Sequence, residues 1–100
     1  MTTIKVTKDQ DFIKNIEIKG HSGYAVSGKD IVCAAISSSA ITTINAIISL
    51  DEFAIEVKQD EGYLLISTLK NEDVINKLLN NLVDMLADIA SDYPKYVKII

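Results

Sequence analysis

Residues 20–38 read GHSGYAVSGKDIVCAAISS, and this stretch joins two kinds of structure. Its first part holds three of the four glycines of the chain, which predicts a loop. The only histidine, His21, opens that loop, and the only cysteine, Cys33, follows it. The segment that begins at Asp30 then runs to Leu50 without glycine or proline. The stretch therefore leads from a loop into one long regular element.

Asp30–Leu50 is predicted to be a buried helix. Its apolar positions recur three or four residues apart, the spacing of one helix face. These positions are Ile36, Ala40, Ile44 and Ile47. Ile, Val and Thr are mediocre helix formers, but about 20 unbroken residues are too long for one strand. Asp30 is expected to be the N-cap.

The residues before the loop predict a hairpin. Residues 3–7 alternate between apolar and polar side chains, as a half-buried strand does. Lys8–Asp11 supply a polar turn, and a second strand runs from Phe12 to about Lys19, with Ile16 and Ile18 facing inward. The turn lacks the glycine of the tightest hairpins.

The residues after the long helix repeat this plan. A strand from Phe53 to Lys58, a turn at residues 59–62 and a strand at Tyr63–Thr68 form a second hairpin. Tyr63–Thr68 is apolar on both faces and is expected to lie inside the sheet. Asn71 is the expected N-cap of a second helix, which ends near Ser91 or Asp92, before Pro94. Tyr96–Ile100 is the expected last strand.

The predicted order is therefore β-β-α-β-β-α-β in one domain, residues 1–100. This order indicates an α+β fold, a two-layer sandwich in which two helices pack on one face of an antiparallel or mixed sheet. The order of the strands within the sheet does not follow from the sequence.

The composition of the chain limits the classes of function that we expect. The net charge is −4 and all basic residues are lysine, which argues against direct nucleic-acid binding. A single cysteine forms no intramolecular disulfide, so we expect a cytoplasmic protein. We find no signal-like amino terminus and no uninterrupted apolar run of about 20 residues, so no membrane contact is expected. One Cys and one His without ligand-spaced partners predict no metal, and no cofactor is expected.

Cys33 has two interpretations. Free cysteines often only pack in the core, and that structural role is the first. The second follows from its position: if Asp30 caps the helix, Cys33 lies in the first helical turn. There the unpaired amides favour a thiolate and are also ready donors for an oxyanion.

Three neighbouring residues complete the candidate site. His21 is either an ordinary loop histidine or the proton partner of Cys33. Asp30 caps the helix, orients His21, or does both. Ser37 follows Cys33 by four residues and so shares its helix face, where bonding to the helix backbone is its ordinary role.

At these positions the chain resembles the ribosomal-processing cysteine proteases, the Prp family. The resemblance rests on Gly20-His21, a short glycine-containing loop, Asp30-Ile31-Val32-Cys33-Ala34, and then Ser37. Chain length and element order agree along the whole chain.

The resemblance implies a Cys–His endopeptidase that removes the amino-terminal extension of a large-subunit ribosomal protein and forms a homodimer. Carried over by position, Cys33 is the nucleophile and His21 the general base and acid. Gly20, Asp30 and Ser37 then match motif positions that support the site. Two alternatives stay open: a non-catalytic ribosome-associated module that binds protein, and a thiol redox sensor, which requires an exposed Cys33.

Overall fold

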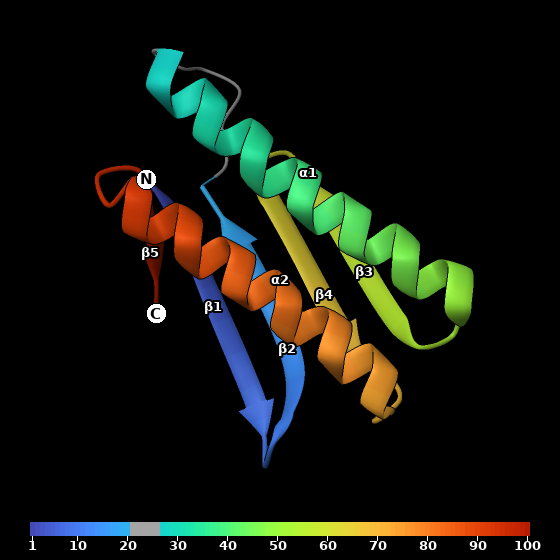
Figure 1. Ribbon diagram of the computed structural model, residues 1–100. Helices are drawn as coiled ribbons and strands as arrows, with labels where there is room; N and C mark the ends of the chain where they lie inside the picture. The colour runs from blue at the N-terminus through green and yellow to red at the C-terminus, as the bar shows by residue number, and fades with distance from the viewer. Residues whose placement is uncertain (21–26) are drawn as a thin grey trace.

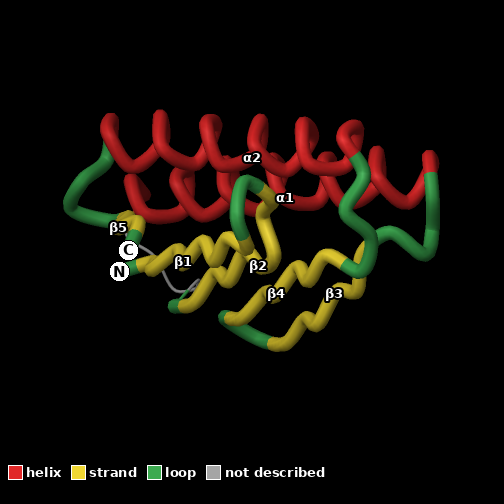
Figure 2. Tube along the Cα trace, turned by 90° about the horizontal axis from the view of Figure 1, so that it is seen from below, coloured by secondary structure: helices red, strands yellow, loops and turns green. Residues whose placement is uncertain are grey.

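The computed structural model describes residues 1–20 and 27–100 of the chain, with only the backbone described at residues 27–30. The predicted element order is confirmed. The elements are β1 (Thr2–Asp9), β2 (Phe12–Lys19), α1 (Ser27–Leu50), β3 (Ile55–Asp60), β4 (Tyr63–Thr68), α2 (Asp73–Asp92) and β5 (Val97–Ile99). Both helices lie on one side of the sheet and run antiparallel to each other (Figures 1 and 2). The predicted α+β two-layer sandwich is therefore confirmed.

The sheet is mixed, and its strand order is β3-β4-β2-β1-β5. Both predicted hairpins pair antiparallel, and β2 joins them by pairing antiparallel with β4. Only β5 runs parallel to its neighbour, β1. The expectation that β4 lies inside the sheet is confirmed, because it is flanked by β3 and β2. Among the described residues, β3 and β5 are therefore the two edge strands of the sheet.

The first hairpin turns more tightly than predicted. Its strands extend to Asp9 and from Phe12, and Gln10 takes the left-handed backbone conformation (φ 58°) that such a turn needs. The pairing slips between Thr7 and Lys8, where β2 carries an extra residue, Lys14. Because of this bulge, Ile13 faces the helices together with Ile16 although the two lie three residues apart.

Helix α1 begins three residues earlier than predicted, at Ser27, so the prediction that Asp30 is its N-cap is wrong. Residues 31–50 carry no charge, and this segment is long and apolar enough to cross a membrane by length and composition alone. Serine, threonine and asparagine interrupt the segment, so the expectation of no uninterrupted apolar run of about 20 residues is confirmed, and the core helix of a folded domain can meet the same criterion of length and composition. In this fold Val32, Ile36, Ala40 and Ile47 of α1 are buried in the protein core.

Helix α2 follows its predicted stripe, and Ile75, Leu79, Leu82 and Leu86 are buried. Its N-cap is Glu72 rather than Asn71, and Glu72 makes no side-chain capping bond. Instead, the side-chain oxygen of Asn76 in the first turn accepts a hydrogen bond from the Ile13 amide at 3.1 Å. This bond ties the start of α2 to β2 across the two layers.

Strand β3 has the predicted length but begins and ends two residues later than predicted, and strand β5 is shorter than predicted. Strand β3 begins at Ile55 because residues 52–54 form a turn, and the Phe53 side chain is 67% exposed. Strand β5 spans only Val97–Ile99. Its Val97 is buried, and the Ile100 amide donates to the Ile4 carbonyl oxygen at 2.8 Å. The last strand thereby closes the sheet beside the amino terminus.

Candidate active site

Cys33 lies in the second turn of α1, as the seventh residue of the helix. The prediction of a first-turn position is therefore wrong. Only the first four amides of a helix lack a partner within it, so the Cys33 amide belongs to the regular helical ladder. The argument that unpaired helix amides activate the thiol or hold the oxyanion at Cys33 does not apply to this geometry.

The Cys33 side chain is buried, with 5% of its surface exposed. Its neighbours Val32 and Ile36 are likewise buried and belong to the contiguous apolar core. A redox sensor needs an oxidant to reach this thiol and a protease needs a peptide to reach it, so burial by itself does not separate these two roles.

Ser37 lies one helical turn beyond Cys33 and is half-buried. It lines a cavity of about 60 Å³ between α1 and the hairpin of β3 and β4. The cavity wall is mostly apolar and includes Ile18 of β2 and Ile36 of α1, together with Gln59 and Asp60 at the end of β3. The helix face that carries Ser37, one turn beyond Cys33, therefore lies against the β3–β4 hairpin.

Gly20 is held on two sides. It has a left-handed backbone (φ 84°), and its amide donates to the Gly62 carbonyl oxygen in the β3–β4 turn at 3.0 Å. A Cβ atom at this position would lie 2.5 Å from the Met1 carbonyl oxygen. Only glycine fits this backbone and this close approach. The residue before His21 is thus fixed by the amino terminus and by the β3–β4 turn.

Charged groups surround this point on the open face of the sheet. The Tyr63 hydroxyl donates to a Glu17 carboxylate oxygen at 2.9 Å, and this hydrogen bond raises the pKa of Tyr63 above its usual range. The Lys19 ammonium lies 3.5 Å from the other Glu17 oxygen and 6.0 Å from the centre of the Tyr63 ring. These contacts join the ends of β2 and β4 beside Gly20.

The predicted dyad is only partly placed. His21 lies outside the described residues, so its distance to Cys33 stays a prediction. The backbone of Asp30 lies within the first turns of α1. Gly20 and Ser37 both border the β3–β4 turn, one through a hydrogen bond and the other through the cavity. Within the described residues, no group of three or more His, Cys, Asp or Glu could hold a metal ion.

Sequence reasoning did not include the β3–β4 turn in the site. Asp60 and Gly62 lie more than 20 residues after Cys33, and no local pattern marks them. Their place follows from the pairing of β2 with β4, which puts Lys19 opposite Tyr63. Only the strand order could have revealed it.

Comparison with known proteins agrees along the whole chain. The family model described as "Cysteine protease Prp" matches residues 1–98. The ribosomal processing cysteine protease Prp of Staphylococcus aureus is 26% identical over 99% of this chain and 97% of its own length. The protein of that name from Bacillus subtilis is 25% identical over 97% and 92%.

A solved structure shares both the fold and the chain length. It is the S. aureus Prp protease in complex with a covalently linked product peptide, with a TM-score of 0.88 and 25% identity over 99% of this chain and 97% of that one. The family match leaves out only the last two residues and includes strands β1 to β4, both helices and the single cysteine on α1. The chain belongs to the Prp family of cysteine proteases.

Proposed function

We propose that Cys33 is the nucleophile of this protease and that His21 is its general base and acid. One observation carries this proposal: the cysteine protease family model covers residues 1–98, and that range holds a single cysteine and a single histidine. A cysteine protease needs a thiol nucleophile and a group that moves its proton. Each role has one residue of the usual type in the matched range.

The reaction follows from these two roles. The imidazole of His21 takes the thiol proton, and Sγ of Cys33 attacks the scissile carbonyl carbon to form a tetrahedral intermediate. The C–N bond then breaks, the leaving amine receives the proton from His21, and a thioester remains. Water, deprotonated by His21, hydrolyses the thioester and restores the thiol. The covalently linked product peptide of the S. aureus neighbour supports such a covalent route.

The substrate that we propose is the amino-terminal extension of a large-subunit ribosomal protein. The relatives named above are ribosomal processing proteases, and this chain matches them over nearly its whole length. Its net charge of −4 suits a basic polypeptide. A chain without arginine is poorly equipped to bind RNA directly, so the recognised partner is the protein. Such a substrate places the enzyme in the cytoplasm.

Cleavage of peptides tests the dyad and the substrate together. Synthetic peptides that cover the extended amino termini of large-subunit ribosomal proteins would be incubated with the wild type, Cys33→Ala and His21→Ala, and the fragments weighed. We expect one peptide to be cut by the wild type and by the control Thr42→Ala, which changes an exposed side chain of the same helix outside the proposed dimer interface. Both dyad variants should lose at least about a thousandfold in rate. Cleavage by Cys33→Ala would refute the mechanism.

The same experiment distinguishes the protease from a non-catalytic binding module. A non-catalytic ribosome-associated module would bind one of these peptides without producing fragments, even at high enzyme concentration and long incubation. In that case Cys33→Ala and the wild type would give the same binding curve and the same intact peptide. Fragments that need the thiol exclude this alternative.

We further propose that the protein forms a homodimer through the outer face of α1. Six exposed positions of this helix follow one another at alternating spacings of three and four residues, the seam of a helix pair. They are Ile31, Ala34, Ser38, Ile41, Asn45 and Ile48. Ile31 is 62% exposed and Ile41 46% exposed, and no charged residue interrupts the segment from 31 to 50. A second copy would remove these side chains from water.

Light scattering on the purified protein tests the dimer. The wild type should have the mass of two chains, and the double variant Ile41→Lys, Ile48→Lys that of one, because two ammonium groups cannot be buried in an apolar seam. Val74→Lys changes an equally exposed apolar residue on α2 and should stay dimeric. Monomeric wild type, or a dimer that survives both lysines, would exclude this interface.

A further inference from the structure

We propose that the edge strand β3 binds the peptide substrate as an added strand of the sheet, and that the peptide recognised there is basic. This inference rests on the proposed function, since it concerns the substrate of that same site. It assigns to Ile55–Asp60 a role in specificity that neither the catalytic residues nor the family match implies.

The sheet offers two edges, and they are not equivalent. Strand β3 has six residues and β4 pairs with one of its sides, so the amides and carbonyls of its other side point away from the sheet. Strand β5 has only three residues. An added strand gains affinity from a row of main-chain hydrogen bonds. The longer edge therefore suits a peptide better.

The charge of the β3 segment indicates what kind of peptide it binds. Residues 51–61 hold five acidic residues and one lysine, a net charge of −4 that equals the net charge of the whole chain. Asp51 already pairs with Lys70 outside this segment. Glu56, Asp60 and Glu61 are all exposed. Pairing two such edges from two copies would bring like charges together, which is unfavourable. A basic peptide is the complementary occupant.

Strand β3 also ends at the candidate active site. Gln59 and Asp60, its last two residues, line the cavity beside Ser37. Ser37 lies four residues from Cys33, about 6 Å along the helix axis. The turn that follows β3 accepts the hydrogen bond of Gly20 through Gly62. A peptide paired along β3 is therefore led towards the helix turn that carries the thiol.

Binding must be measured without cleavage. Cys33→Ala protein would be titrated with the ribosomal peptide that the wild type cuts, and amide hydrogen exchange recorded with and without the peptide. We expect slower exchange at amides of residues 56–59 and unchanged exchange at residues 97–99. Methylation of every second peptide nitrogen should weaken binding in one register and leave it unchanged in the other, because only alternate amides face the edge. Protection of β5 instead of β3 would overturn the proposal.

Charge is tested with two matched sets of three substitutions in the Cys33→Ala background. Glu56→Gln, Asp60→Asn and Glu61→Gln together should weaken binding about tenfold at low salt and flatten its salt dependence. Asp84→Asn, Asp88→Asn and Asp92→Asn remove equal charge from exposed positions of α2 and should leave affinity within about twofold. Equal losses of affinity in both sets would show that only the net charge of the protein matters, and this result would overturn the proposal.

The outcomes separate this inference from the proposed function. If the wild type cuts the peptide but the β3 variants bind and cut it normally, the docking site is wrong and the protease mechanism stands. If a basic ribosomal peptide binds and protects β3 but is never cut, the docking site stands and the proposed reaction is wrong. A second copy on β3 would give slow exchange at residues 56–59 without peptide, together with a dimer mass by light scattering in the variant Ile41→Lys, Ile48→Lys, and this outcome excludes the peptide.

Discussion

At the scale of single residues, Gly20 links the backbone to the chemistry. Its left-handed conformation and its contact with Met1 both demand glycine, and Gly62 in the β3–β4 turn also has a left-handed conformation (φ 68°). The two glycines also share a hydrogen bond. From the sequence, Gly20 is assigned to the site only because it matches a motif position of the resembled family. The structure gives the physical reason why this position requires glycine.

Substitution of Gly20 tests this reason. Gly20→Asn should lower the free energy of unfolding by more than about 2 kcal/mol, since asparagine tolerates a positive φ but its Cβ still meets the Met1 carbonyl oxygen. Gly62→Asn should cost less than about 1 kcal/mol. Urea denaturation measures both, and peptide cleavage should fall with Gly20→Asn. Equal effects at the two glycines would show that conformation, rather than the contact with Met1, sets the requirement.

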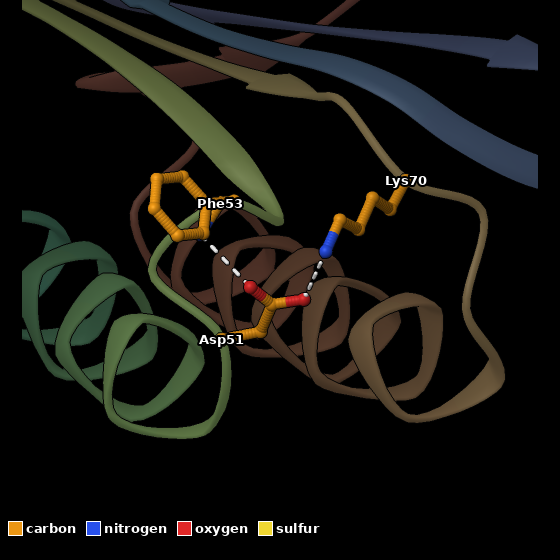
Figure 3. A network of polar contacts seen from close by, with 3 residues as sticks. All are labelled: Asp51, Phe53 and Lys70. Atoms are coloured by element: carbon orange, nitrogen blue, oxygen red, sulfur yellow. Dashed lines mark hydrogen bonds and ion pairs between the residues drawn. The ribbon is translucent and has the colours of Figure 1, made fainter.

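Asp51 organises the connection from α1 to β3 (Figure 3). One carboxylate oxygen accepts the Phe53 amide at 2.9 Å, and the other accepts the Lys70 ammonium at 2.8 Å. The hydrogen bond from Lys70, followed by that from Phe53, lowers the pKa of Asp51 below the ordinary value of 3.8. The bond to Asp51 likewise raises the pKa of Lys70 above 10.5.

The lowered pKa sets a pH dependence of stability. Because the carboxylate binds protons less readily in the folded chain, its contribution is complete above pH 3.8 and is lost as the pH falls through the folded-state pKa below that value. Asp51→Asn should therefore lower Tm at pH 7 but leave Tm near pH 2 close to that of the wild type. Thermal unfolding followed by circular dichroism from pH 7 to pH 2 checks this. An equal loss of Tm at every pH would contradict it.

At the scale of elements, the apolar patterns correctly predicted which helices and strands exist, but they misplaced the first or last residue of several of them. Helix α2 has a clean apolar stripe, and its end at Asp92 agrees with the prediction. Helix α1 is apolar on nearly all sides, so its pattern does not mark where the helix begins. The start at Ser27 lies in residues with glycine and lysine that the sequence assigns to a loop. The position of Cys33 along the helix was misjudged for the same reason.

The buried apolar face of α2 can be tested by comparing the same substitution at a buried and at an exposed leucine. Leu86 is fully buried beneath α2, whereas Leu69, just after β4, is 58% exposed. Leu86→Ala should lower the free energy of unfolding by about 2–5 kcal/mol, through lost burial and the cavity left behind. Leu69→Ala removes the same atoms from the surface and should cost less than about 1 kcal/mol. Similar costs, measured by urea denaturation, would mean that α2 does not pack as the structure shows.

At the scale of the whole molecule, the features that could not be predicted from the sequence are those that depend on pairing between distant strands. No local pattern places β2 beside β4 or β5 beside β1, because these partners lie more than 40 residues apart in the chain. Those pairings bring Gly62 to Gly20 and bring the last residues to the first. The residue types of the site could be proposed from the sequence, whereas its surroundings required the sheet.

Strand β5 is the smallest element and still completes the fold. It adds to β1 in parallel, buries Val97, and lies where the buried Thr2 donates its amide to the Tyr96 carbonyl oxygen at 2.8 Å. Deletion of residues 97–100 removes a buried valine and several ladder hydrogen bonds. The loss should reach about 3–5 kcal/mol, a large part of the stability of a domain of this size.

Urea denaturation of the truncated chain measures this loss, with Ile100→Ala as the control. That variant keeps the backbone bond to Ile4 and shortens a side chain that is 59% exposed, so it should cost less than about 1 kcal/mol. Truncation should also leave β1 as a new sheet edge, which promotes association at high concentration. A truncated chain that unfolds at the urea concentration of the wild type would show that the four-stranded sheet is stable by itself, with β5 only resting on it.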